Sequence, residues 1–337
     1  MDPVIEVAGL TKVYRTYRKE AGLLGSLRGM VRRRYEETVA ASDITFRVGA
    51  GELVGFLGPN GAGKTTVLKM LSGLLFPTRG GATVMGYRPW ERKDAFRRRF
   101  SLVMGQKNQL WWDLPASDSL ELNRVIYGIG TAEARRTIDE LTEWLDVRDK
   151  LRVMVRELSL GERMKFELIA ALLHRPEVLF LDEPTIGLDV VSHKKVREFL
   201  SDYARKRRIT VLLTSHYMRD IEELCHRVLI VDHGRLFFDG PLAEITDRFS
   251  SHKMLTLRRD AGLPELDYAA LGEVQERDGQ KIRLRVPRTG LIAASQRLLE
   301  AVQPDDVTIE EVPIEEIIRS VFVAQGELSR GKVESGG

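Results

Sequence analysis

The stretch best suited to chemistry is GPNGAGKTT at residues 58–66. It follows the apolar run LVGFLG and opens the helical pattern TTVLKML, the strand–loop–helix setting in which G-x-x-x-x-G-K-[ST] binds phosphate. The glycines let backbone N–H groups converge on phosphate oxygens, and the helix N-terminus adds partial positive charge. Lys64 supplies a full charge to the terminal phosphates, and the Thr65 hydroxyl can bind Mg²⁺. The motif predicts nucleoside triphosphate binding by Gly58, Pro59, Asn60, Gly61, Ala62, Gly63, Lys64, Thr65 and Thr66.

A second chemical feature is the pair of acids in VLFLDEP at residues 178–184. Four apolar residues predict a buried strand that carries Asp182 to the carboxyl edge of a sheet, where doubly wound folds bind ligands. There Asp182 can complete the coordination of Mg²⁺, and Glu183 can aim at an attacking water. Adjacent acids at a strand end are usually solvated turn residues, but the phosphate loop favours a metal-binding Asp182 and a catalytic Glu183.

The segment LSLGERM at residues 158–164 admits two interpretations. Ser159 with Glu162 three residues later is a capping box, in which each side chain satisfies a backbone N–H at a helix start. Apolar residues at helical spacing follow it until Pro176. Taken alone, the pattern favours a simple helix start over a role towards a nucleotide held by a second molecule.

A sheet must position these residues. Near-continuous apolar runs predict a mostly parallel sheet covered on both faces, with strands at 53–58, 100–104, 178–182, 210–215 and 227–232. Helical periodicity without such runs predicts an inserted helical subdomain at about 107–175.

Beyond residue 242, apolar and polar residues alternate, as they do in half-exposed strands. The pair Asp278-Gly279 predicts a tight hairpin turn. With a short helix near 264–270 and a longer one at 290–303, the order β-α-β-β-α-β predicts a small ferredoxin-like α+β domain.

Composition excludes several classes of protein. The 337 residues are 43% hydrophobic and 30% charged, as in ordinary globular proteins, and the length suggests about two domains. A net charge of +3 gives no reason to expect a nucleic-acid partner. The single cysteine, Cys225, excludes an internal disulfide framework and is expected in the core. No apolar run reaches the ~18 residues of a membrane span, and no signal pattern opens the chain, so we expect neither a spanning helix nor secretion.

A basic segment occupies about 18–36. From Arg15 to Tyr35 the chain has seven Arg or Lys residues, Arg15 included, against Glu20 alone, with apolar residues on one helical face. Such a segment predicts contact with an anionic membrane surface or docking on a partner, and a solvated basic loop is the alternative.

Six motifs occur in a fixed order: GPNGAGKTT at 58–66, GQ ending at 106, LSLGE at 158–162, LFLDEP at 179–184, GLD at 187–189 and TSH at 214–216. With this set, residues 4–240 resemble the ATP-binding subunits of ABC transporters. The resemblance implies an α/β P-loop NTPase of the ABC ATPase type with an inserted helical subdomain. We therefore expect an ATP-binding domain at 1–241, a small regulatory or dimerisation domain at 242–325 and a disordered tail at 326–337.

In this family the LSGGQ signature both begins a helix and faces the γ-phosphate of ATP held by the opposite subunit. Both interpretations of LSLGERM, hereafter the signature segment, therefore hold together. Ser159 and Gly161 match the contacting residues. Leu160 and Glu162 replace the usual glycine and glutamine, and Glu162 should weaken the contact unless Arg163 offsets its charge or the carboxylate stays in its cap.

Four further residues take roles from the resemblance. Gln106 resembles the glutamine that senses Mg²⁺ and the attacking water, and His216 resembles the switch histidine that contacts the γ-phosphate. Asp189 resembles the acid that couples the two sites across the dimer. Tyr14, with Tyr17 as a substitute, resembles the aromatic that stacks on adenine, and an edge-strand aromatic is the alternative.

The resemblance implies an ATPase in which two chains sandwich two ATP molecules with Mg²⁺, and in which Glu183 and His216 are catalytic. Its implied partners are integral-membrane permease subunits and a second ATP-binding subunit, either the same chain or a paralogue. We expect peripheral attachment at the cytoplasmic face of the cell membrane, with Trp111 and Trp112 as docking anchors or, equally, as core residues. The chain looks most similar to bacterial exporter ATPases of the drug-resistance and sodium-extrusion kind. An importer ATPase or a soluble non-transport ABC ATPase is the alternative.

Overall fold

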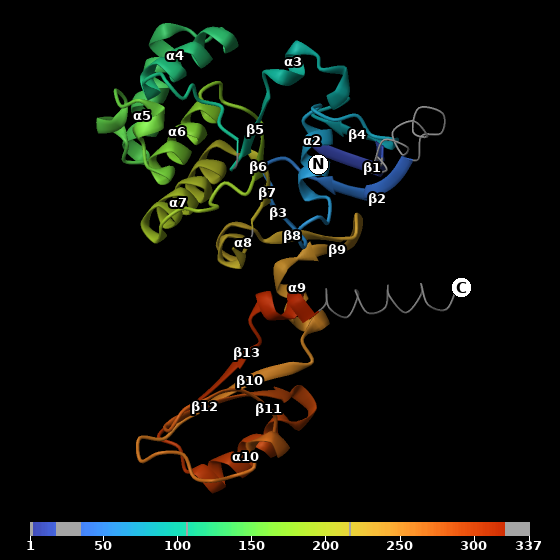
Figure 1. Cartoon of the computed structure of the whole chain (residues 1–337), viewed down its shortest axis with the longest axis vertical. Coiled ribbons are helices and arrows are strands. Elements are labelled where there is room, and N and C mark those ends of the chain that lie inside the picture. The colour runs from blue at the N-terminus through green and yellow to red at the C-terminus, as the bar shows by residue number, and fades with distance from the viewer. Residues whose placement is uncertain (1–2, 18–34, 106, 216, 321–337) are drawn as a thin grey trace, which may run out of the picture. The chain divides into compact units, whose positions relative to one another are not determined.

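The chain divides into two compact units, Met1–Gly240 and Pro241–Gly337 (Figure 1). The computed structural model describes residues 3–17, 35–105, 107–215 and 217–320. Four predicted features lie outside the described residues: Gln106, His216, the basic segment through residue 34 and the expected tail at 326–337.

A six-stranded sheet forms the middle of the larger unit, with strand order β5-β6-β7-β3-β8-β9. Its strands are β3 (Leu53–Leu57), β5 (Phe100–Met104), β6 (Val178–Asp182), β7 (Thr210–Thr214), β8 (Arg227–Asp232) and β9 (Arg235–Pro241). The first five confirm the predicted runs, and their neighbouring pairs are parallel. Every residue of β6 and β7 is buried, which explains their continuous apolar sequences. The carboxyl ends of these strands therefore meet at one edge of the sheet.

A second sheet of this unit was not among the predicted elements. It is antiparallel, with order β2-β1-β4, and consists of β1 (Ile5–Tyr17), β2 (Tyr35–Val48) and β4 (Arg79–Val84). Helix α2 (Lys64–Leu71) packs between the two sheets (Figure 1). Phe46 of β2 and Phe56 of β3 lie in the shared core, with ring centroids 6.1 Å apart. The sheet escaped prediction because β4 starts with Arg-Gly-Gly and β1 mixes polar residues and Gly9 into its apolar positions.

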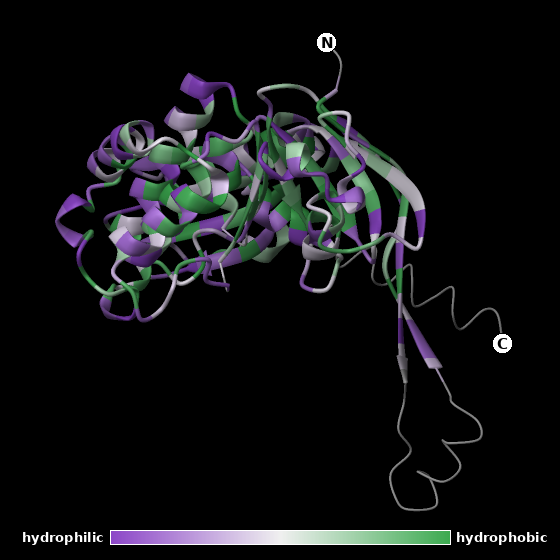
Figure 2. Ribbon diagram, turned by 90° about the horizontal axis from the view of Figure 1, so that it is seen from above, coloured by the Kyte–Doolittle hydropathy of each residue, from purple (hydrophilic) through white to green (hydrophobic). Residues whose placement is uncertain are grey.

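The inserted subdomain is helical, as the expected fold class requires. It contains α4 (Ala116–Tyr127), α5 (Thr131–Trp144) and α6 (Leu160–Leu172), and α7 (Val190–Arg207) packs beside α6. Figure 2 shows hydrophobic residues gathered in the interior of this unit and hydrophilic residues on the outer turns of the helices. Outside the inserted subdomain, the larger unit also contains two shorter helices, α3 (Asp94–Arg97) and α8 (Met218–Leu224). Across the described ranges, each helix is either too short or too polar to span a membrane.

The smaller unit has its own four-stranded antiparallel sheet, with order β11-β12-β10-β13. Its elements are α9 (Leu242–Phe249), β10 (His252–Arg258), β11 (Glu273–Arg277), β12 (Lys281–Pro287), α10 (Leu291–Val302) and β13 (Asp306–Glu311). Helix α10 covers one face, where Leu298 packs with Leu255 and Leu284. The predicted hairpin turn is present, since the Asp278 N–H donates to the Lys281 carbonyl at 2.9 Å.

The predicted helix near 264–270 is wrong, because only a single 3-10 turn forms, at Tyr268–Ala270. The Tyr268 hydroxyl donates to the Pro264 carbonyl at 3.0 Å, and the Asp267 side chain accepts the Ala270 N–H at 3.3 Å. These local bonds satisfy the backbone without a continuous helix, and Tyr268 still enters the core.

Candidate functional site

The phosphate loop connects the end of β3 to the first residue of α2, Lys64. At Gly63, φ is 103°, and a Cβ there would lie 2.0 Å from the Ala40 carbonyl oxygen, so this position requires glycine. Lys64 Nζ donates to the carbonyls of Gly58 at 2.6 Å and Pro59 at 3.1 Å. The ammonium group is thus held within the loop, at the helix N-terminus where an anion is favoured.

The electrostatics of Lys64 follow from its burial. Burial lowers the pKa of its ammonium group, and the nearby carboxylates of Glu183 and Asp182 oppose that shift. Negative charge close to a buried ammonium favours its charged form, so a phosphate group bound in the loop would stabilise the Lys64 ammonium.

Asp182 lies at the carboxyl end of β6 with both of its oxygens engaged. The Thr65 hydroxyl donates to Oδ2 at 2.8 Å, and the Thr214 hydroxyl donates to Oδ1 at 2.8 Å. Asp182 is only 7% exposed. A buried carboxylate beside a threonine hydroxyl offers the hard oxygen ligands that Mg²⁺ prefers, so these residues fit a magnesium ion.

Glu183 follows directly and has a positive φ of 55°, which is uncommon for a residue with a side chain. Its N–H donates to both the carbonyl and the hydroxyl oxygen of Thr214, each at 3.1 Å. Gly105 packs against it closely, because a Cβ at Gly105 would lie 2.1 Å from the Glu183 carbonyl oxygen. This fixed backbone turns the chain at the sheet edge, beside the phosphate loop.

The signature segment forms the predicted capping box at the start of α6. The Ser159 hydroxyl accepts the Glu162 N–H at 3.2 Å, and Glu162 Oε2 accepts the Ser159 N–H at 2.9 Å. Glu162 Oε1 also lies 3.5 Å from Lys150 Nζ, and the Ser159 N–H bond lowers the pKa of the Glu162 carboxyl. Arg163 is directed elsewhere, with its guanidinium 5.4 Å from the ring centre of Trp112. The negative charge of Glu162 is therefore retained in the cap and offset by Lys150 rather than by Arg163.

The signature segment lies against the start of α7. A Cβ at Gly161 would fall 2.3 Å from the Ser192 hydroxyl, so glycine is needed there. Leu160 contacts the chain at Gly187, where a Cβ would lie 2.9 Å from the Leu160 side chain. Asp189 caps α7 by accepting the N–H groups of Val191 and Ser192, and these bonds lower the pKa of its carboxyl. The structure thus brings Ser159, Gly161 and Asp189 into one cluster.

The structure describes some of the remaining predicted site residues but not all of them. Tyr14 lies on β1 and is 37% exposed, with Lys12 Nζ 5.4 Å from its ring centre, so it is available for stacking. Tyr17 ends the same strand. The structure does not describe Gln106 or His216. In the phosphate loop, Ala62 is buried and Asn60 is exposed, and Thr66 lies in the first turn of α2.

Trp111 and Trp112 are exposed by 43% and 46%, which contradicts the core-packing alternative. Both tryptophans come shortly after residues that line an apolar groove of 290 Å³. The groove is lined by residues that follow α2, by residues of β5 and by residues that follow β5: Ser72, Leu74, Phe100, Leu102, Met104, Lys107, Asn108 and Gln109. Of these lining residues, Leu74 is 58% exposed.

Two residues that support the site were not singled out from the sequence. Thr214 orients both Asp182 and Glu183, and its position in the TSH motif was the available signal. Lys150 pairs with Glu162 from a preceding turn, and no local pattern indicates that pairing.

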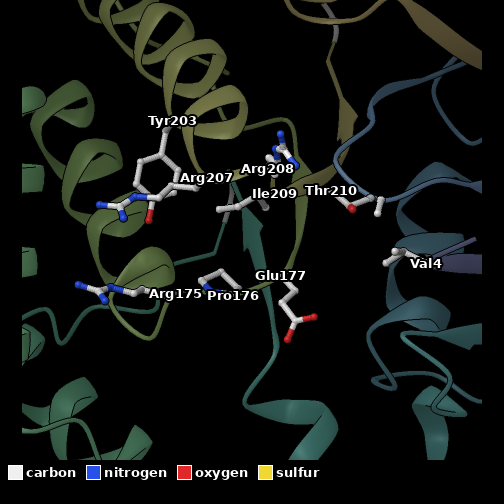
Figure 3. A pocket seen from close by; sticks show the side chains of 10 residues that line it. Val4, Arg175, Pro176, Glu177, Tyr203, Arg207, Arg208, Ile209 and Thr210 are labelled. Carbon is white, nitrogen blue, oxygen red and sulfur yellow. The ribbon is translucent and has the colours of Figure 1, made fainter. Parts of the chain in front are cut away.

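A separate hollow of 240 Å³ lies at the opposite edge of the sheet, at the amino ends of β6 and β7 (Figure 3). Arg175, Glu177 and Arg207 line it. Ligands of parallel sheets bind at the carboxyl edge, and each of these three side chains is already paired with an opposite charge. We therefore assign no nucleotide to this hollow.

Comparisons with known proteins agree with this geometry. Residues 41–186 match the ABC transporter family, and residues 251–310 match the C-terminal domain of EvrA-like ABC transporters. The daunorubicin resistance ATP-binding protein DrrA3 of Streptomyces coeruleorubidus is 34% identical over 285 residues, 84% of this chain and 89% of that protein. The Nod factor export ATP-binding protein I of Burkholderia thailandensis is 37% identical over 210 residues, 62% of this chain and 68% of that protein. A solved ATP-binding subunit of an ABC transporter superposes with a TM-score of 0.61 at 27% identity, over 73% of this chain and 93% of that one.

Proposed function

The chain belongs to the family of ABC transporter ATP-binding proteins and is an ATPase, and from that premise we propose that it powers the export of a solute through a separate membrane permease. Two copies, or one copy and a paralogue, would close around two ATP molecules. The observation that carries the proposal is the clustering of Ser159, Gly161 and Asp189 with two valines at the start of α7. Val190 and Val191 are 85% and 78% exposed, an apolar surface that a second subunit would cover.

In this proposal the phosphate loop binds the triphosphate through its backbone N–H groups, and Lys64 exchanges its carbonyl partners for phosphate oxygens. Tyr14 is the proposed stacking partner of the adenine. Thr65 and Asp182 would hold Mg²⁺, which when bound neutralises charge on the terminal phosphates.

Glu183 is the proposed general base, and it orients or deprotonates the attacking water. Its backbone is fixed by Thr214 and Gly105, so its carboxylate starts from a defined point at the sheet edge. We assign Gln106 and His216 the supporting roles that the resemblance implies, at the metal and at the γ-phosphate.

Ser159 and Gly161 would complete the site of the opposite subunit from the N-terminus of α6. The retention of Glu162 in its cap, with Lys150 beside it, supports this role, because the carboxylate is satisfied within its own chain. The substitution of Glu162 for the usual glutamine is then compatible with an anion at this helix end.

The proposal of export rests on two relatives, a daunorubicin resistance protein and a Nod factor export protein. The groove beside β5, which Leu74 lines, and the exposed Trp111 and Trp112 support docking of a permease, since aromatic side chains are enriched at interface hot spots. We infer peripheral attachment to the membrane through this surface. The C-terminal unit, which has its own core, is a proposed regulatory or dimer-stabilising domain.

Size-exclusion chromatography of the full chain carrying Glu183→Gln tests the two-subunit site. We expect a monomer without nucleotide and a dimer with ATP and Mg²⁺, because slowed hydrolysis traps the closed state. Adding Val190→Asp should abolish the dimer and leave ATP binding intact, whereas adding Lys64→Ala should abolish both. A chain that binds ATP and stays monomeric alone and with its paralogue would contradict the proposal.

Cell fractionation tests the docking surface. Leu74→Asp should move the protein from the membrane fraction to the supernatant of its own host cells, since a charge would enter the apolar groove. Ile292→Asp is the matched control, because Ile292 is 75% exposed in the other unit and contributes nothing to the groove. Equal distributions of the two variants would exclude this groove as the docking site.

A further inference from the structure

Glu167 is a buried acid that the mechanism above does not use. It lies on α6 and is only 3% exposed. Carboxylates are almost never this buried unless their oxygens are hydrogen-bonded, because desolvation disfavours the charge. Burial raises the pKa of Glu167 to about 7, although its hydrogen bonds and the charge of Arg163 oppose this shift.

The partners of Glu167 are backbone N–H groups from one short loop. Its Oε1 accepts the Gln109 N–H at 2.9 Å and the Leu110 N–H at 3.3 Å, and its Oε2 accepts the Gln109 N–H at 3.0 Å. The loop is the segment 107–112, hereafter the docking segment. Its first three residues line the groove, and it also contains Trp111 and Trp112. Glu167 on α6, the helix that the signature segment begins, therefore binds the loop that follows Gln106.

Two further contacts of the docking segment show which elements it connects. The guanidinium of Arg163, four residues before Glu167 and so on the same face of α6, lies 5.4 Å from the ring centre of Trp112. In the other direction, the Gln109 side-chain amide donates to the Leu102 carbonyl of β5 at 2.7 Å. The docking segment is thus bound to α6 on one side and to the nucleotide-binding sheet on the other.

We propose that Glu167 is a positioning residue that fixes the docking segment to α6. The docking segment and the signature segment, at the start of the same helix, then move as one body. The six residue steps from Gly161 to Glu167 span about 9 Å, a distance over which an α-helix is rigid. This inference rests on the proposed function, since it explains how closure around ATP is transmitted to the docking surface.

The charge argues for positioning rather than for simple packing. A buried carboxylate is a costly way to fill space, because burial disfavours its charge, and the raised pKa of Glu167 reflects this cost. Glutamine keeps the shape but removes the charge, and it places an amide group beside backbone N–H donors. Glu167→Gln should therefore loosen the docking segment without lowering the stability of the fold.

Hydrogen–deuterium exchange of the full chain, read by mass spectrometry over residues 107–113, tests this inference. All variants carry Glu183→Gln, and each is measured with and without ATP and Mg²⁺. At about pH 8, where Glu167 is mostly charged, Glu167→Gln should raise exchange of the docking segment about tenfold or more, because the Gln109 and Leu110 N–H groups lose a charged acceptor. The change in exchange that ATP causes there should also disappear, while the melting temperature stays equal or rises.

Glu143→Gln is the matched control, because it removes the same charge from an exposed position on α5. Glu167→Asp is a second variant, and it should restore part of the protection because it keeps a charged acceptor. Docking-segment exchange that is the same in the Glu167→Gln and Glu143→Gln variants would overturn the inference. A lowered melting temperature with faster exchange across the whole helical subdomain would also overturn it, since that pattern marks a structural role.

Chromatography of the same samples separates this inference from the proposed function. If the parent chain fails to dimerise with ATP, the two-subunit function fails. If the parent dimerises and its docking segment does not respond to ATP, or responds equally in Glu167→Gln, the function stands and the positioning role is rejected.

Discussion

Replacing Thr214 by valine would remove one hydroxyl from the centre of the proposed catalytic site with little change in shape. Thr214 is fully buried at the end of β7. Its hydroxyl donates to Asp182 Oδ1 at 2.8 Å and accepts the Glu183 N–H at 3.1 Å. The substitution therefore releases one oxygen of Asp182, the proposed metal ligand, and loosens the backbone of Glu183, the proposed general base.

The magnitude follows from these two bonds. A hydrogen bond to a charged group contributes about 1.5–3 kcal/mol, and the added apolar group returns about 0.8 kcal/mol. The Glu183 N–H keeps the Thr214 carbonyl as an acceptor, so no buried donor is left unpaired. We expect the free energy of unfolding to fall by about 1–2 kcal/mol. Misplacement of Glu183 should lower kcat by about tenfold to a hundredfold.

Thr210→Val is the matched control, because Thr210 is buried at the other end of the same strand. Its hydroxyl accepts the Gly51 N–H at 2.9 Å and touches none of the proposed site residues. Urea unfolding should give losses of similar size for the two variants, with unchanged denaturant slopes. Steady-state ATP hydrolysis should fall only in Thr214→Val, and Thr214→Ser should recover it.

Equal hydrolysis by Thr214→Val and Thr210→Val would refute this reasoning. It would mean that neither Asp182 nor Glu183 depends on the Thr214 hydroxyl for its position. If hydrolysis fell in both variants in proportion to their loss of unfolding free energy, the hydroxyl of Thr214 would likewise have no specific role in catalysis.

Three further outcomes are expected. Lys64→Ala should abolish binding of a fluorescent ATP analogue, because it removes the ammonium group of the phosphate loop. The unfolding midpoint should be retained, because among the described residues the hydrogen bonds of Lys64 go to carbonyls of its own loop and burial already disfavours its charge. Burial raises the pKa of Glu167 from 4.5 to about 7. Between these two values the native chain keeps a proton that the unfolded chain releases. The free energy of unfolding should therefore fall as the pH rises from about 4.5 to about 7. Glu167→Gln should flatten this pH dependence in urea titrations at about pH 5 and about pH 8. Burial raises the pKa of the Cys225 thiol, so a thiol reagent should label it only after unfolding, and rapid labelling of the native chain would contradict its placement in the core.

Much of the larger unit could be predicted because its signals are local. Continuous apolar runs identified β3, β5, β6, β7 and β8, since strands buried on both faces have no polar alternation. The capping box was predicted from Ser159 and Glu162, which lie within one helical turn of each other. The antiparallel sheet was missed because β4 and part of β1 lack such patterns, and the helix near 264–270 was wrong because local bonds hold that segment in another form.

By itself, the sequence determined the chemical groups of the site: a lysine and a threonine in a phosphate loop, two acids at a strand end, and a serine and a glycine at a helix start. Only the tertiary structure decided which atoms of these groups meet. Thr65 reaches Asp182 across 117 residues, and Glu167 reaches Gln109 across 58. The physical reason is that the burial of a charged group is tolerated only where the fold supplies its hydrogen-bond partners, and those partners come from strands and loops that are distant in the chain.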